Sequence, residues 1–175
     1  LANDEKNNFQ ENLKIINNQI KQIENLVNEF SDFARMPKPI FKDNNLIQLV
    51  TDNIKLLSEV DKSIKIKLMN DSSKIYFKSD KEQLNRVFFN LIKNSIESIH
   101  EKSDKTGDFD KKISVEISEN NSHIKFILID NGIGFKEFGD KIKQILNPYY
   151  TTKKNGTGLG LSIVNKIIND HNGII

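Results

Sequence analysis

The stretch that decides the fold is Gly156-Thr157-Gly158-Leu159-Gly160, followed directly by Leu161-Ser162-Ile163-Val164-Asn165-Lys166-Ile167-Ile168. Apolar residues recur at helical spacing in the second part, so we predict a helix from the last glycine to about Asn172. Glycine-rich backbone at a helix N-terminus presents free amide groups and the positive end of the helix dipole. The stretch therefore predicts a binding site for an anion such as a phosphate group.

Two other phosphate-binding motifs are absent from the sequence, and the segment before the glycines is ambiguous. Neither the dinucleotide pattern G-x-G-x-x-G in a βαβ setting nor the P-loop pattern G-x-x-x-x-G-K-[S/T] occurs. Lys153 and Lys154 could offset charge on a transferred phosphoryl group, or they could be ordinary surface charges. Tyr149 and Tyr150 fit core packing as well as ligand contact.

Upstream of this region, Asp130-Asn131-Gly132-Ile133-Gly134 follows an alternating strand predicted over His123–Ile129. The two glycines allow backbone to approach a flat ligand closely, and the carboxylate could accept a hydrogen bond from an adenine amino group. The same residues also fit an ordinary Asp-Asn-Gly turn. Taken alone, this turn does not decide between the two interpretations.

A strongly amphipathic helix is predicted from about Asp80 to His100, with Ser79 and Glu82 as its capping box. Its polar side carries Asn90 and Asn94, one turn apart. An amide oxygen is a suitable neutral ligand for Mg²⁺, but two asparagines also fit a solvated helix face. The polar face further includes Gln83, Arg86 and Glu97.

The remaining elements form the rest of an α/β domain. A helix is predicted over Leu46–Val60 and a strand over Ile64–Leu68, with Lys74–Lys78 as the hairpin partner of that strand. Residues 101–112 are predicted to form a loop, followed by a strand over Ile113–Ser118. The last residues, Gly173-Ile174-Ile175, suggest the beginning of another strand.

The N-terminal part differs from the rest, because its apolar residues repeat in steps of four and three from Phe9 to Ala34. Such a heptad seam predicts a long helix that packs in a helical bundle. Pro37 and Pro39 end this helix. The chain therefore divides into a helical arm, a short linker that is a candidate hinge over Met36–Ile40, and one globular domain.

Composition excludes several function classes. The 26 basic and 24 acidic residues nearly cancel and form no long block, so the chain shows no footprint for nucleic acid. The absence of cysteine excludes disulfides and thiolate chemistry. No window reaches the roughly 18 apolar residues of a membrane span, so this chain is not expected to cross a membrane.

The order of the motifs is more specific than any one of them. Asn90-x-x-x-Asn94, Asp130-x-Gly132-x-Gly134, the Tyr-Thr-Thr-Lys segment and Gly156–Gly160 together resemble the N, G1, F and G2 boxes of sensor histidine kinases. Residues 30–39 resemble the NtrY type of nitrogen-regulation kinase. The resemblance implies a two-layer α/β sandwich, with a mixed sheet and three helices, behind a long bundle helix. It also implies a partial dimerisation domain over 1–36, a linker over 37–41 and an ATP-binding catalytic domain over 42–175 whose last strand is truncated.

The resemblance also assigns roles to residues. Asn94 would bind Mg²⁺, Asn90 would contact the phosphates of ATP, Asp130 would read adenine, and Lys153 would approach the γ-phosphate. Residues of about 136–155 would form a lid, in which Tyr149 and Tyr150 replace two phenylalanines. The expected nucleotide-binding residues are Asn90, Asn94, Glu97, Asp130, Gly132, Gly134, Thr152, Lys153, Gly156, Thr157, Gly158, Leu159 and Gly160.

The implied activity is transfer of the γ-phosphate of ATP to a histidine on the dimerisation domain, and from there to a response-regulator aspartate. His100, His123 and His171 are expected to be structural or solvent-facing, so the acceptor would lie outside this chain. The implied partners are a second copy, bound through the N-terminal helix, and a receiver domain. The implied location is cytoplasmic, and anchoring of the parent protein in the inner membrane stays open.

Three alternatives remain. An ATP-hydrolysing relative such as gyrase or MutL would carry a glutamate where Asn90 stands, and a general base for water is then missing at that place. A non-catalytic dimerisation and signalling module would be expected to lack Asp130 or the glycines. A serine-directed kinase of the anti-sigma-factor type would lack the long N-terminal helix.

Overall fold

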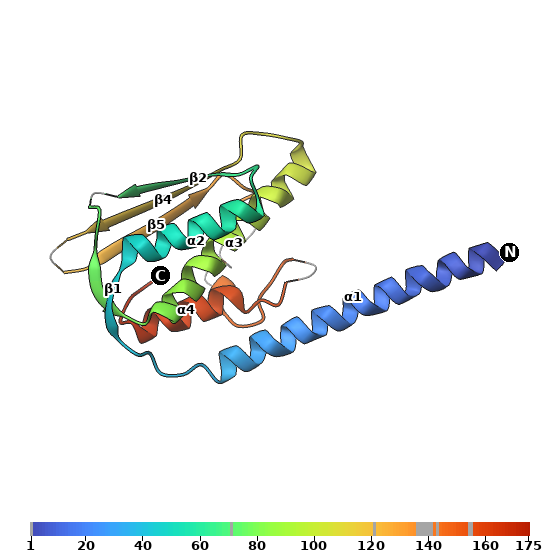
Figure 1. The fold of residues 1–175 in the computed structure, drawn as a ribbon, viewed down its shortest axis with the longest axis horizontal. Coiled ribbons are helices and arrows are strands. Elements are labelled where there is room, and N and C mark those ends of the chain that lie inside the picture. Colours follow the sequence, from blue (N-terminus) through green and yellow to red (C-terminus); the bar gives the residue numbers. More distant parts are fainter. Residues whose placement is uncertain (1, 71, 121, 136–141, 143, 154–155) are drawn as a thin grey trace.

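The computed structural model describes residues 2–70, 72–120, 122–135, 142, 144–153 and 156–175. For residues 2–9, 25 and 32 it describes the backbone without the side chains. A long helix leads into a two-layer α/β domain (Figure 1). The elements are α1 (Ala2–Ala34), β1 (Lys42–Asn45), α2 (Leu46–Val60), β2 (Lys65–Asn70), β3 (Tyr76–Ser79), α3 (Lys81–Thr106), β4 (Lys112–Glu119), β5 (Ile124–Asp130) and α4 (Gly160–Asp170).

The main sheet is mixed, as expected. Its strand order is β2-β4-β5, with β2 parallel and β5 antiparallel to the central strand β4. Helices α2, α3 and α4 lie together on one side of this sheet (Figure 1). The α/β sandwich with three helices and a preceding long helix is therefore confirmed.

The predicted hairpin between residues 64–68 and 74–78 is wrong. β3 instead pairs antiparallel with β1, with Lys42 opposite Ser79. The Asn44 side-chain amide donates to Ser79 O at 2.8 Å, and Leu46 N donates to Ile75 O at 2.8 Å. These long-range bonds hold β3 beside the start of α2, a pairing that alternation within one strand does not indicate.

The core lies between the sheet and the three helices. On β4, every second residue is buried, so Ile113, Val115 and Ile117 face the helices. Ile92 and Ile99 of α3 are fully buried against them. Burying one such side chain stabilises the fold by about 1.5–3 kcal/mol, so this seam fixes α3 on the sheet.

The two ends of α3 differ from the prediction. The N-cap is Asp80, whose Oδ1 accepts from Gln83 N at 3.0 Å, while Ser79 is fully buried as the last residue of β3. The predicted capping box is therefore wrong. The helix also continues to Thr106 instead of ending at His100, which removes half of the predicted loop. Gly107 ends it with φ +84°, a conformation that favours glycine.

The C-terminal helix α4 ends at Asp170, two residues earlier than predicted. Residues 173–175 form no strand and pair with none of the described strands, in contrast to the prediction, and Ile174 is 95% exposed. The ring of His171, just after the helix, accepts from Asp80 N at 3.0 Å and contacts Ile167 O. This histidine therefore joins the end of α4 to the start of α3.

Helix α1 confirms the predicted long N-terminal helix and extends away from the domain (Figure 1). Its apolar seam is exposed over most of its length, for example 61% at Ile23. Near its end, Phe33 and Met36 pack against the core. No helix within the described residues is long and apolar enough to cross a membrane.

The linker after α1 is attached to the first turn of α3. Ile40 N donates to Asp80 Oδ2 at 2.8 Å, and the Gln83 side-chain amide donates to Pro37 O at 2.9 Å. A hinge over residues 36–40 would have to break these bonds. The suggested hinge stays a prediction.

Candidate functional site

The polar face of α3 and the glycine-rich start of α4 lie against each other. A Cβ added to Gly160 would lie 3.3 Å from Asn90 Oδ1 and 3.9 Å from Asn94 Nδ2. Asn90 Nδ2 donates to Arg86 O at 2.8 Å, so its amide oxygen is directed toward α4. Two segments that are far apart in the sequence therefore meet in the structure.

The turn after β5 lies against α3 one helical turn beyond Asn94. Gly132 N donates to Asp130 Oδ1 at 2.9 Å, which folds the turn back on the carboxylate. Ile133 N lies 3.2 Å from both Ser98 O and Ser98 Oγ. A Cβ on Gly132 would come within 2.6 Å of the carbonyl carbon of Ser98, so this position has room for glycine alone.

The glycine-rich loop is closed at its base. Tyr149 N donates to Gly158 O at 3.0 Å, and Gly158 has φ +70°. A Cβ there would come within 2.5 Å of the carbonyl carbon of Tyr149. Glycine is therefore needed at Gly158 both for its conformation and for the close approach of the two backbones.

Two side chains of the predicted phosphate-binding segment contact carboxylates. Lys153 pairs with Glu97 of α3, and the Thr157 hydroxyl donates to Glu29 of α1. Thr157 Oγ1 also accepts from Leu159 N at 3.3 Å. Both groups that are expected near the phosphates are thus engaged with acidic residues.

The other predicted site residues make fewer contacts with α3 and the glycine-rich loop. Gly134 has φ +72° with open space around it, Thr152 is exposed, and Thr151 Oγ1 accepts from Lys153 N at 3.1 Å. Much of the predicted lid over 136–155, including Lys154, lies outside the described residues.

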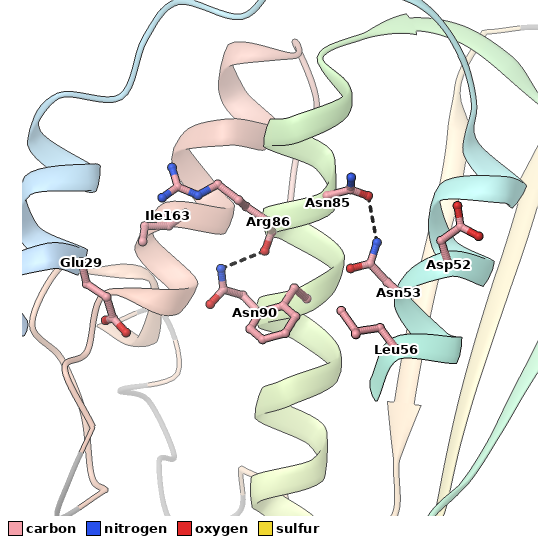
Figure 2. A pocket seen from close by; sticks show the side chains of 9 residues that line it. Glu29, Asp52, Asn53, Leu56, Asn85, Arg86, Asn90 and Ile163 are labelled. Carbon is pink, nitrogen blue, oxygen red and sulfur yellow. Dashed lines mark hydrogen bonds between the residues drawn. The ribbon is translucent and has the colours of Figure 1, made fainter. Parts of the chain in front are cut away.

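A cavity of about 460 Å³ opens between α1, α2, α3 and α4 (Figure 2). Figure 2 shows Asn53 and Asn85 bridging α2 and α3 on one side, with Glu29 on the other. Of the residues predicted to bind nucleotide, Asn90 alone lines this cavity. The cavity therefore lies beside the predicted site and does not coincide with it.

Sequence reasoning missed two residues of this region, Ser98 and Glu29. Ser98 continues the four-residue spacing of Asn90 and Asn94 along α3, and this spacing could have identified it. Glu29 lies 128 positions from Thr157, and no local pattern indicates their contact.

The fold and the site define the class of the protein. Residues 79–175 match the family model described as "Histidine kinase-, DNA gyrase B-, and HSP90-like ATPase", and the chain belongs to this family. More particularly, the chain is 35% identical over 171 residues to the "Putative sensor histidine kinase NtrY-like" of Rickettsia felis. That alignment covers 98% of the chain and 27% of the relative, so the chain spans about a quarter of that relative's length.

Solved structures agree with this assignment. The catalytic domain of histidine kinase ThkA, in a nucleotide-free form, is 29% identical with a TM-score of 0.62, over 75% of this chain and 81% of that chain. ThkA in complex with the response regulator protein TrrA is 25% identical with a TM-score of 0.70, over 91% of this chain and 43% of that chain. The resemblance to NtrY-type sensor histidine kinases is confirmed.

Proposed function

We propose that this chain is the ATP-binding catalytic part of a sensor histidine kinase, which transfers the γ-phosphate of ATP to a histidine of the dimerisation domain. The Asp130 turn and the glycine-rich loop both lie against the same helix, α3, beside Asn90 and Asn94. This arrangement is the observation that carries the proposal. Family membership supports ATP as the ligand.

The residues fit the ligand at two points. At the adenine end, Asp130 Oδ1 is bound within the turn, and Oδ2 has no partner among the described residues. It is therefore available to accept from an amino group of a base. At the phosphate end, the amide groups at the start of α4 suit an anion.

Magnesium would be bound mainly by the phosphates and water. Within the described ranges there is no cluster of three or more His, Cys, Asp or Glu side chains that could bind a metal. The Asn94 amide oxygen is the protein ligand that we propose, since Mg²⁺ in such sites keeps several waters and phosphate oxygens. When bound, the ion would neutralise charge on the phosphates.

The remaining proposed residues position the transferred group. Asn90, one helical turn from Asn94, would contact the phosphates, and Lys153 would approach the γ-phosphate after leaving Glu97. Gly132 and Gly134 would allow the base to approach, with Glu97 and Thr152 at the edge of the site. The loop at Gly156, Thr157, Gly158, Leu159 and Gly160 would surround the phosphates.

The three histidines support an acceptor elsewhere in the parent protein. His100 Nε2 contacts Asp61 at 2.6 Å, and His123 contacts Asn120 and Ser122 at the β4–β5 turn. His171 bridges α3 and α4, as described above. Each histidine ring therefore has a structural partner, and none of these partners belongs to the glycine-rich loop.

Partners follow from the same proposal. In the parent protein, α1 would pair with a second copy of the chain through its exposed apolar residues, such as Ile16, Ile20 and Ile23. The proposed dimerisation segment spans residues 1–36, and residues 37–41 would link it to the catalytic domain at 42–175. The ThkA structure contains a response regulator, which supports a receiver domain as the second partner.

Calorimetric titration of Mg·ATP tests the nucleotide site. Asp130→Asn is expected to weaken binding by about 1–3 kcal/mol, roughly five- to 150-fold, because a charged acceptor is lost. Asn94→Ala should remove the magnesium dependence. The control is Asp108→Asn, an 89% exposed aspartate after α3, which should bind like the wild type. Wild-type affinity in Asp130→Asn would contradict the proposal.

Hydrolysis of ATP is the second candidate function. It is disfavoured because Asn90 replaces the general base and the nearby Glu97 is paired with Lys153 and Lys93. Phosphate release without an added acceptor domain, at a rate equal to that of transfer to an added histidine-bearing domain, would favour this candidate instead.

A further inference from the structure

Ser98 of α3 contacts the Asp130 turn through both its backbone and its side chain. Its carbonyl and its hydroxyl each lie 3.2 Å from Ile133 N. Its Oγ also lies 3.4 Å from Asp130 Oδ1, at the long end of the hydrogen-bond range. The hydroxyl can therefore accept from Ile133 N while its own hydrogen points to the carboxylate.

These contacts divide the two oxygens of Asp130 between two tasks. Oδ1 accepts from Gly132 N at 2.9 Å and faces the Ser98 hydroxyl. Oδ2 has no partner among the residues that the structure describes. A carboxylate held by one oxygen presents the other in a fixed direction, which is the requirement for selective recognition of a donor.

The shape of the turn depends on Ser98 as well. A Cβ on Gly132 would collide with Ser98 Oγ and come within 2.8 Å of Ile99 N. The turn therefore rests directly on this part of α3, and the Ser98 hydroxyl lies in the contact. Removing the hydroxyl leaves Asp130 with the Gly132 amide as its remaining restraint.

We propose that Ser98 is a positioning residue that fixes the Asp130 carboxylate, so that the site selects a base with an exocyclic amino group over one with a carbonyl oxygen. This inference rests on the proposed nucleotide site. An amino group donates to the free carboxylate oxygen, whereas a carbonyl oxygen there faces a second acceptor, and such mismatches discriminate strongly. A carboxylate that rotates freely loses part of this discrimination.

The test compares ATP with inosine triphosphate, which replaces the amino group by a carbonyl oxygen, in wild type and Ser98→Ala. We expect Ser98→Ala to lower ATP affinity about five- to tenfold, the scale of one ordinary hydrogen bond. Affinity for inosine triphosphate should change less than about twofold, because the carbonyl oxygen that replaces the amino group cannot donate to the carboxylate. The selectivity ratio should therefore fall.

Ser103→Ala is the matched control, since Ser103 lies on the same helix, its backbone carbonyl accepts from Gly107 N, and its hydroxyl has no hydrogen-bond partner among the described residues. It should leave both affinities and the ratio unchanged. An equal loss for both nucleotides in Ser98→Ala, or an unchanged ratio, would overturn the positioning role while leaving the nucleotide site intact. If the wild type binds neither nucleotide, the proposed function fails and this inference fails with it.

Discussion

The two ends of the proposed nucleotide site are prepared differently. At the adenine end, the Asp130 carboxylate is bound by an amide two residues away and keeps one oxygen without a partner among the described residues. At the phosphate end, Lys153 and Thr157 already contact Glu97 and Glu29. The adenine end is therefore arranged before a ligand arrives, and we call it the prepared end. The phosphate end is bound to carboxylates of the protein itself, and we call it the engaged end.

This difference indicates how binding would proceed. The Glu29 carboxylate lies beside the glycine-rich loop, where the proposed phosphates would bind. Both groups are anions and both are favoured at a helix N-terminus, so they would occupy the same surroundings. Adenine would meet a site that needs little rearrangement, whereas the phosphates would have to displace Glu29 and free Lys153. The affinity for ATP is therefore expected to include the cost of breaking both contacts.

The largest expected effect comes from damaging the prepared end. Gly132→Ala places a methyl group within 2.6 Å of the Ser98 backbone, so the turn must move away from α3. We expect a loss of about 1–3 kcal/mol of stability and more than about tenfold in ATP affinity, measured by thermal unfolding and calorimetry.

Gly107→Ala is the control for this change, because its φ of +84° also penalises alanine but it lies in open space at the end of α3. It should cost about 1 kcal/mol of stability without weakening ATP binding. Equal loss of binding in both variants would show that general destabilisation, and not the turn, is responsible.

The next effect is a loss of stability on substitution of Asp80, the N-cap of α3, which belongs to neither end of the nucleotide site. Burial raises the pKa of Asp80, but hydrogen bonds from Gln83, Ile40 and Glu82 outweigh it and lower the pKa below its ordinary value. Asp80→Ala should cost about 0.5–2 kcal/mol of stability near neutral pH, the range for a lost helix cap. ATP affinity should change little, since Asp80 lies at the far end of α3 from Ser98.

The pH dependence has a definite sign. The stabilisation by Asp80 is full above the unfolded-state pKa of about 3.9 and is lost as the pH falls through the lowered native pKa. The difference in unfolding free energy between wild type and Asp80→Ala should therefore shrink below about pH 4. Denaturant unfolding across this range measures it, and a difference that grows with acid would contradict the assignment.

The smallest expected effect is a gain in ATP affinity when the contact at the phosphate end is removed. Glu29→Ala removes the contact to Thr157, so ATP affinity should rise by about 1 kcal/mol, roughly fivefold. Glu24→Ala, an exposed position on the same helix, should change nothing. If Glu29→Ala binds ATP no better than wild type, the phosphate end does not have to be opened and the contrast between the two ends fails.

The same contrast explains what the sequence could predict. Helix α2 was predicted with the bounds that it has, and the Asp130 turn and the start of α4 were identified, because each depends on neighbouring residues. Asp80 and Ser79 are both good caps, and only the pairing of β3 with β1 decides between them. Long-range pairs such as Glu29 with Thr157 leave no local pattern, so the state of the phosphate end could not be predicted.

The parallel pairing of β2 with β4 also sets the order in which the chain assembles. Lys65 lies opposite Lys112, so 47 more residues (112 minus 65) must be made before β2 meets its neighbour. At about 5–20 residues per second, ribosomal synthesis takes roughly 2–9 s to supply them. β5 then joins β4 as a local antiparallel strand, with Ile113 opposite Asp130. The carboxylate that would read adenine is thus positioned only after the central strand β4 has been made.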